Sequence, residues 1–183
     1  MHHEASTLSR IAHELGLATW LGGNVFGQVA LNPTVQRISS KRERGRVVNE
    51  SWGRFTAVNA AAMAATVLTW RKGGIRSADG DLGVEASSLV SLKNLLLGGA
   101  VITSVASGLL GARIARQDWE SAPPVESGTD PAPETPQEAA TAQRLIKVFG
   151  SSSIALLAGV VATSAAIESN SRSPRSIVQR FLF

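Results

Sequence analysis

One stretch, residues 10–33, constrains this chain more than any other. It reads RIAHELGLATWLGGNVFGQVALNP and is apolar over most of its length. A helix over residues 11–31 rises ~1.5 Å per residue and so covers about 30 Å, the thickness of the hydrocarbon core of a bilayer. Pro33 is expected to end this helix, because proline cannot donate the next backbone hydrogen bond. We therefore predict a first membrane-spanning helix over about 11–31, retained as an anchor.

The polar residues of this stretch share one side of the predicted helix. At ~100° per residue, His13, Asn24 and Gln28 fall close together, with Trp20 beside them. Polar side chains in a membrane helix face the bundle interior or a water-filled cavity. The stripe of His13, Asn24 and Gln28 is therefore predicted to face inward. It would either bridge neighbouring helices or line a path for a substrate or ion.

Small residues recur at four-residue spacing and predict close helix packing. Gly23 and Gly27 form a GxxxG pattern, which lets another backbone approach closely. Similar pairs occur later in the chain, so the predicted packing residues are Gly23, Gly27, Ser104, Gly108, Ala155 and Gly159.

Three further apolar stretches predict three further spans, at about 52–70, 88–111 and 142–167. The second lies between Trp52 and Trp70, which a helix places ~27 Å apart, one at each membrane interface. Lys93, near the start of the third, can extend its long side chain to the interface. The predicted fold is all-α: a single membrane domain, residues 1–183, built as an integral membrane bundle of four transmembrane helices.

The segments between the spans carry most of the charge. Residues 34–50 hold five basic residues, Arg37, Lys41, Arg42, Arg44 and Arg46, against two glutamates. Such a run could bind nucleic acid or anionic lipid, but short cytoplasmic loops are commonly rich in lysine and arginine. We favour the topological interpretation, which places this loop in the cytoplasm and both termini outside. Basic residues at 71–76 and 172–180 argue for the opposite orientation.

Residues 118–142 have a different composition. They contain five of the seven prolines and six acidic residues, with few large apolar side chains. A segment of this kind buries too little surface to offset its ordering entropy. The sequence therefore predicts a disordered acidic, proline-rich loop between the last two spans.

Reactive groups are scarce. The chain has no cysteine and three histidines, and it contains no P-loop, Rossmann, HExxH or GxSxG pattern. We therefore expect no enzymatic activity, no cofactor, no catalytic residue and no metal site within the spans. The Met1-His2-His3 start could bind Cu²⁺ through nitrogen ligands.

The pattern of His13, Gly16, Trp20, Gly22-Gly23 and Phe26, followed by Pro33 and a basic loop, resembles two membrane families. One is the transmembrane protein 205-like family of small four-helix proteins, whose function is unknown. The other is the copper resistance D type membrane domain, which also opens with a His…Trp-x-Gly-Gly helix. The first resemblance implies a fold and a membrane, and the second would imply copper handling.

The sequence therefore predicts a multi-pass protein of the cell membrane. Its expected role is structural or accessory, with a membrane-protein partner or a second copy, the lipid bilayer around it, and no nucleic acid. The alternative is a small transporter or a copper-handling protein, motivated by the polar stripe of the first span.

Overall fold

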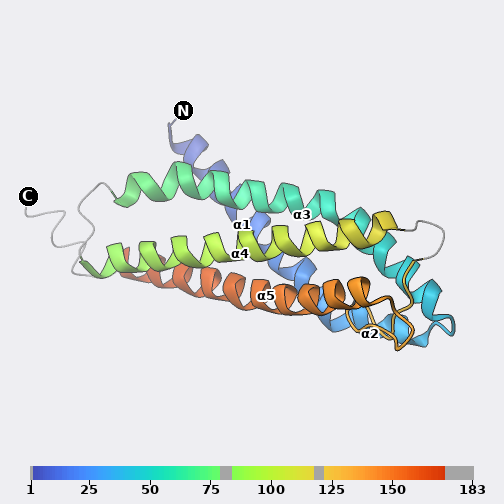
Figure 1. The fold of residues 1–183 in the computed structure, drawn as a ribbon. Coiled ribbons are helices and arrows are strands. Elements are labelled where there is room, and N and C mark those ends of the chain that lie inside the picture. The colour runs from blue at the N-terminus through green and yellow to red at the C-terminus, as the bar shows by residue number, and fades with distance from the viewer. Residues whose placement is uncertain (1, 79–83, 118–121, 172–183) are drawn as a thin grey trace, which may run out of the picture.

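The chain folds into a bundle of long helices. The structure is a computed structural model that describes residues 2–78, 84–117 and 122–171 (Figure 1). Within these ranges the regular structure is helical, apart from one isolated β-bridge between Val125 and Pro131. The long helices are α1 (His2–Phe26), α3 (Lys41–Ala78), α4 (Val84–Gln117) and α5 (Gln137–Ser171). The predicted all-α class is confirmed.

The first helix does not stop at Pro33. After α1 the chain forms a π-helical turn (Gly27–Leu31), the short α2 (Asn32–Thr34) and a 3-10 turn (Val35–Arg37). The Asn32 N–H bonds to the Gly27 carbonyl across the π turn. Pro33 is accommodated because it lies in the first turn of α2, where its missing N–H has no required partner. The helical path ends at Ile38, whose backbone is extended.

The helices form two antiparallel pairs. α1 packs on α3 and α4 packs on α5, with fewer contacts between the pairs. Successive long helices run in opposite directions, so the start of α1 lies at the same end as the end of α5 (Figure 1). The 34–50 segment and residues 122–136 lie together at the other end, which we call the basic end.

Buried residues recur at steps of three and four along the helices. In α4 the buried residues are Val90, Lys93, Leu97, Ala100 and Ile114. Steps that alternate between three and four average 3.5 residues, and this spacing is typical of helices that pack almost parallel or antiparallel with interlocking side chains. The central core contains Leu17, Trp20, Ala62, Leu97, Ala100, Leu157 and Val160.

Two of the described helices are long and apolar enough to cross a membrane. These are the parts of α4 and α5 that cover Ser87–Arg116 and Gln137–Ser169. Only 11% and 17% of their most apolar windows are buried. Core helices of soluble proteins are mostly buried, so these values favour helices that face lipid. α1 and α3 do not reach the same apolarity, so the structure supports two of the four predicted spans by length and composition.

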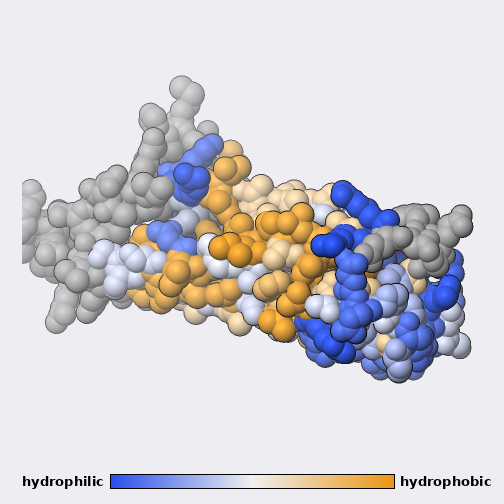
Figure 2. Space-filling model, in the orientation of Figure 1, coloured by the Kyte–Doolittle hydropathy of each residue, from blue (hydrophilic) through white to orange (hydrophobic). Residues whose placement is uncertain are grey.

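Apolar surface covers the middle of the bundle on the face that Figure 2 shows, and we call it the apolar belt. Figure 2 shows this belt between two hydrophilic ends, the larger of which is the basic end. Leu95, Ile102 and Leu109 of α4 are each at least two-thirds exposed. A contiguous apolar belt of this kind is unusual on a soluble monomer and supports association with a membrane.

Residues 122–136 differ from the predicted disordered loop. We call this segment the strap, because it lies across the basic end and contacts the start of α3. Val125 N–H bonds to the Lys41 carbonyl, and Gly128 N–H bonds to the Asn32 carbonyl. Ala122, Val125 and Ala132 of the strap are buried. The segment is ordered by contacts with residues that lie 80 or more positions earlier in the chain, which a local reading of its composition does not include. α5 begins at Gln137, before the predicted 142.

Candidate functional site: a polar seam inside the bundle

A row of polar side chains runs along the inner face of α1 and of the π-helical turn and α2 that follow it, and we call it the polar seam. It begins at His13, passes Trp20 and Asn24 in α1, and ends at Gln28 in the π turn and Asn32 in α2. His13 and Asn32 are buried, and Asn24 and Gln28 are half-buried. The three residues predicted as an inward stripe therefore lie on the inner side of α1, in contact with other helices.

His13 is held between α3 and α4. Its Nδ1 lies 3.0 Å from the Thr66 carbonyl oxygen and 3.2 Å from the Thr69 hydroxyl, and its Nε2 lies 3.2 Å from Lys93 Nζ. A carbonyl can only accept and an ammonium can only donate. Nδ1 therefore carries the hydrogen and Nε2 carries the lone pair, which fixes a neutral imidazole in this arrangement.

Lys93 does not extend to the membrane interface. Its residue is only 2% exposed, and its Nζ lies 3.7 Å from the centre of the Trp70 ring, which forms a cation–π contact. Among the residues whose side chains the structure describes, no carboxylate lies within ion-pair distance of Nζ. The Trp70 indole donates to Asn94 Oδ1 at 2.7 Å, which fixes the ring over the ammonium.

Trp20 connects three helices at the middle of the bundle. It is completely buried, and its indole N–H donates to the Ser104 hydroxyl of α4 at 3.0 Å. Ser104 in turn lies 2.9 Å from the Ser153 hydroxyl of α5. Asn24 donates to the Trp20 carbonyl at 2.7 Å, with Asn59 of α3 at 3.5 Å.

The last part of the seam lies under the strap. Asn32 donates to Gln28 Oε1 and accepts from the Trp52 indole at 3.2 Å. A side chain at Gly128 would overlap with the Asn32 amide, so this position requires a glycine for the close approach of the strap.

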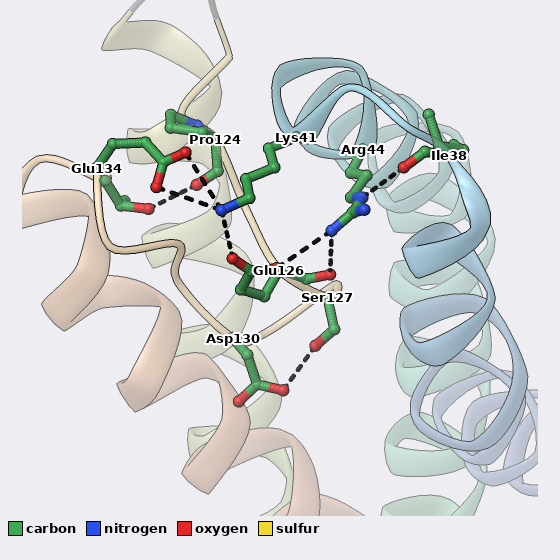
Figure 3. Close-up of polar contacts among 9 residues, drawn as sticks. Ile38, Lys41, Arg44, Pro124, Glu126, Ser127, Asp130 and Glu134 are labelled. Atoms are coloured by element: carbon green, nitrogen blue, oxygen red, sulfur yellow. Dashed lines mark hydrogen bonds and ion pairs between the residues drawn. The ribbon is translucent and has the colours of Figure 1, made fainter.

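The strap is fixed to the basic end by ion pairs. Glu126 lies 2.6 Å from Lys41 Nζ and 3.3 Å from Arg44 Nη1, as Figure 3 shows. Asp130 accepts from Lys147 of α5 and from Ser127, both at 2.6 Å. These two hydrogen bonds hold the pKa of the Asp130 carboxyl below its ordinary value, with Lys147 as the main cause.

The predicted packing residues divide into two groups. Gly23 and Gly27 lie directly under the rings of Phe55 and Trp52, and Gly159 lies under Leu96. Ser104 makes the hydrogen bonds described above.

Gly108 and Ala155 are exposed, and a Cβ added at Gly108 would meet no atom within 4 Å. Steps of four residues advance ~40° around a helix each time, so a four-residue row turns away from an interface that repeats every 3.5 residues.

Sequence reasoning missed several members of the site. Lys93 was expected at the interface, and the partners Trp70, Asn59 and Ser153 were not connected with the stripe. The 3.5-residue spacing of Val90, Lys93 and Leu97 is the signal that would have placed Lys93 inside.

The site offers little to a metal ion. Both ring nitrogens of His13 are engaged, and Lys93 brings a positive charge to within 3.2 Å of Nε2. Among the described residues no group of three or more histidine or acidic side chains is placed to hold a metal. The Met1-His2-His3 site lies outside the residues whose side chains the structure describes.

Comparisons with protein-family models, with curated proteins and with solved structures find no match. The resemblances to the transmembrane protein 205-like family and to the copper resistance D type domain therefore stay predictions.

Proposed function

We propose that this protein is a multi-pass protein of the cell membrane that crosses the bilayer four times. α1 has 25 residues and α3 has 38, and both exceed the ~20 residues that a span requires. Both lie in the same bundle as the two apolar helices, and the apolar belt covers the middle of that bundle on the face in Figure 2. The positive-inside rule then places the basic end in the cytoplasm and the start of α1 outside.

Within the membrane we propose a structural or accessory role, without enzymatic activity. One observation carries it: the outward face of α5 presents a row of small, exposed residues, Ser151, Ala155, Ala158, Ala162 and Ala165. They follow one another at steps of three and four and so form one continuous face. Small residues allow another helix to approach closely in lipid, where close packing drives association. The occupant is another membrane protein or a second copy of this chain.

The interior supports the same role. Most polar groups of the seam form hydrogen bonds to other helices of the bundle. His13 bonds to α3 and α4, Trp20 to α4, and Asn32 to α3. Hydrogen bonds of this kind hold membrane helices together. The polar stripe then stabilises the bundle, and the surface that remains for a partner is the outer face.

Site-specific photo-cross-linking in membranes tests this role. A photoreactive amino acid at Ala158 is expected to give a discrete adduct, whereas the same amino acid at the fully buried Ala100 gives none. An adduct of twice the chain mass identifies a second copy, and any other mass identifies a different protein. Ala158→Leu should remove the adduct formed from a photoreactive residue at Ala162. Absence of a discrete adduct from both α5 positions rules out the accessory role.

Lys93 favours a second candidate, a small transporter. An ionisable side chain within a span commonly marks a path for substrates or protons. Because Lys93 brings N–H donors and a positive charge next to His13 Nε2, this path would suit protons or an anion better than copper. Uptake assays with Lys93→Met and with the Asn24→Leu, Gln28→Leu double variant test it. Unchanged uptake in both variants excludes transport through the seam.

A further inference from the structure

The basic end carries more positive charge than its ion pairs use. Among the described residues this end has ten basic side chains, within residues 37–54 and 113–147, and six acidic ones. Five of the basic side chains form ion pairs: Lys41 and Arg44 with the strap, Arg54 with Glu50, Arg113 with Glu138, and Lys147 with Asp130. These pairs use five of the six acidic side chains and leave Glu43 alone.

Five arginines of the basic end therefore have no ion-pair partner among the described residues. They are Arg37, Arg42, Arg46, Arg116 and Arg144. All five are exposed. The basic cluster of residues 37–46 therefore has two kinds of member. Lys41 and Arg44 form ion pairs with the strap, whereas Arg37, Arg42 and Arg46 form none among the described residues.

Three of the free arginines lie close to the predicted membrane surface. Arg42 and Arg46 are four residues apart and so project from one face of α3, away from the Arg44 side that meets the strap. Arg46 is six residues before Trp52, about 9 Å along the helix, and an arginine side chain can extend back over much of that distance. Arg37 ends the 3-10 turn nearby.

We propose that Arg37, Arg42 and Arg46 form a binding surface for the phosphate headgroups of anionic lipids. A guanidinium matches phosphate through paired hydrogen bonds, and the cytoplasmic leaflet carries anionic lipid that attracts basic residues at its surface. The strap gives this surface its specificity, because it neutralises the two basic residues on the opposite side of the α3 start.

Competition between two spin-labelled lipids tests the proposal. The full chain is reconstituted in phosphatidylcholine vesicles, and the protein-bound fractions of labelled phosphatidylglycerol and labelled phosphatidylcholine are compared. We expect a preference for phosphatidylglycerol that weakens with added salt. The triple variant Arg37→Gln, Arg42→Gln, Arg46→Gln should lower it by about fivefold for each arginine that reaches a headgroup.

A charge-neutral variant is the matched control. Glu50→Gln with Arg54→Gln removes a paired arginine from the same helix and should leave the preference unchanged, because that guanidinium already has a carboxylate partner. A phosphatidylglycerol preference that survives the triple variant overturns the proposal. Binding of a short single-stranded oligonucleotide through the same arginines, without lipid preference, also overturns it.

The proposal depends on membrane insertion, and flotation separates the two questions. A chain that fails to float with any vesicle contradicts both the proposed function and this surface. A chain that floats with pure phosphatidylcholine but shows no preference for phosphatidylglycerol contradicts the headgroup surface alone.

Discussion

Replacement of Lys93 by methionine should stabilise the bundle. The substitution keeps an unbranched chain but removes a buried ammonium that has no carboxylate partner among the described residues. Two contacts are lost, the cation–π contact with Trp70 (about 0.5–2 kcal/mol) and the donor to His13 Nε2 (about 1–3 kcal/mol). Burying a charge that contacts no carboxylate costs several kcal/mol, which we expect to exceed the sum of the two contacts. We expect Lys93→Met to raise the free energy of unfolding by roughly 1–3 kcal/mol.

Unfolding in mild detergent, followed by tryptophan fluorescence, measures this effect. Lys72→Met at the same end is the control, because Lys72 is exposed and its substitution should change stability by less than about 0.5 kcal/mol. The His13→Leu, Lys93→Met double variant removes the unpaired acceptor as well and should be more stable than Lys93→Met. A loss of more than about 2 kcal/mol in Lys93→Met would refute the reasoning, because the ammonium would then be fully compensated by its present contacts.

Three other perturbations have expected outcomes. Gly16→Ala should lower the free energy of unfolding by about 1–3 kcal/mol, because its Cβ would lie 2.7 Å from a backbone carbonyl oxygen of α3. Gly22→Ala should raise it by about 0.5–1 kcal/mol, because a Cβ there would meet no atom within 4 Å and alanine favours the helix. The lowered pKa of Asp130 means that its ion pair stabilises the docked strap above the ordinary carboxyl pKa and is lost as the pH falls through the carboxyl range. The protection factors of the strap amides against hydrogen exchange should therefore fall in acid, and less steeply in Asp130→Asn. A cysteine at Val105 should resist a membrane-impermeant maleimide, whereas one at Arg42 should react.

These outcomes have clear opposites. Equal melting temperatures for the two glycine variants would contradict the close α1–α3 contact. Protection factors of the strap amides that do not change with pH in the acid range would contradict the role of Asp130. Fast labelling of the cysteine at Val105 in intact vesicles would contradict a lipid-facing α4.

Local signals in the sequence predicted most of the helices. The apolar lengths of 88–111 and 142–167 correspond to α4 and α5, and the pair Trp52 and Trp70 marked the apolar part of α3, which carries no charge from Phe55 to Trp70. Each of these signals lies within one helix, because hydrophobic length and aromatic ends are properties of a single segment. The four-span arrangement in a bilayer stays a prediction.

The strap and Lys93 could not be predicted in the same way. The composition of the strap is too polar for it to become ordered alone. Its order comes from contacts with Lys41, Arg44 and Asn32 on distant segments. The burial of Lys93 depends on the faces of His13 and Trp70, which meet only after three helices have packed. Both features depend on long-range contacts. The spacing around Lys93 would have placed it on an inner face, but no single-segment pattern indicates which residues of other helices it meets there.

The position of the strap has a consequence for biogenesis. The strap is part of the connection between α4 and α5, but its anchors include Lys41 and Asn32, which belong to the earlier hairpin of α1 and α3. During synthesis the first hairpin can form before the second exists. Lys41 and Arg44 then have no ion-pair partner in the strap until Glu126 and Glu134 have been synthesised. The ion pairs of Lys41 and Arg44 with the strap form only when both hairpins have come together, so they act as a latch that closes on correctly assembled molecules. A chain cut between α3 and α4 should still close this latch when its two halves meet in one membrane, because the latch joins the halves without using that connection.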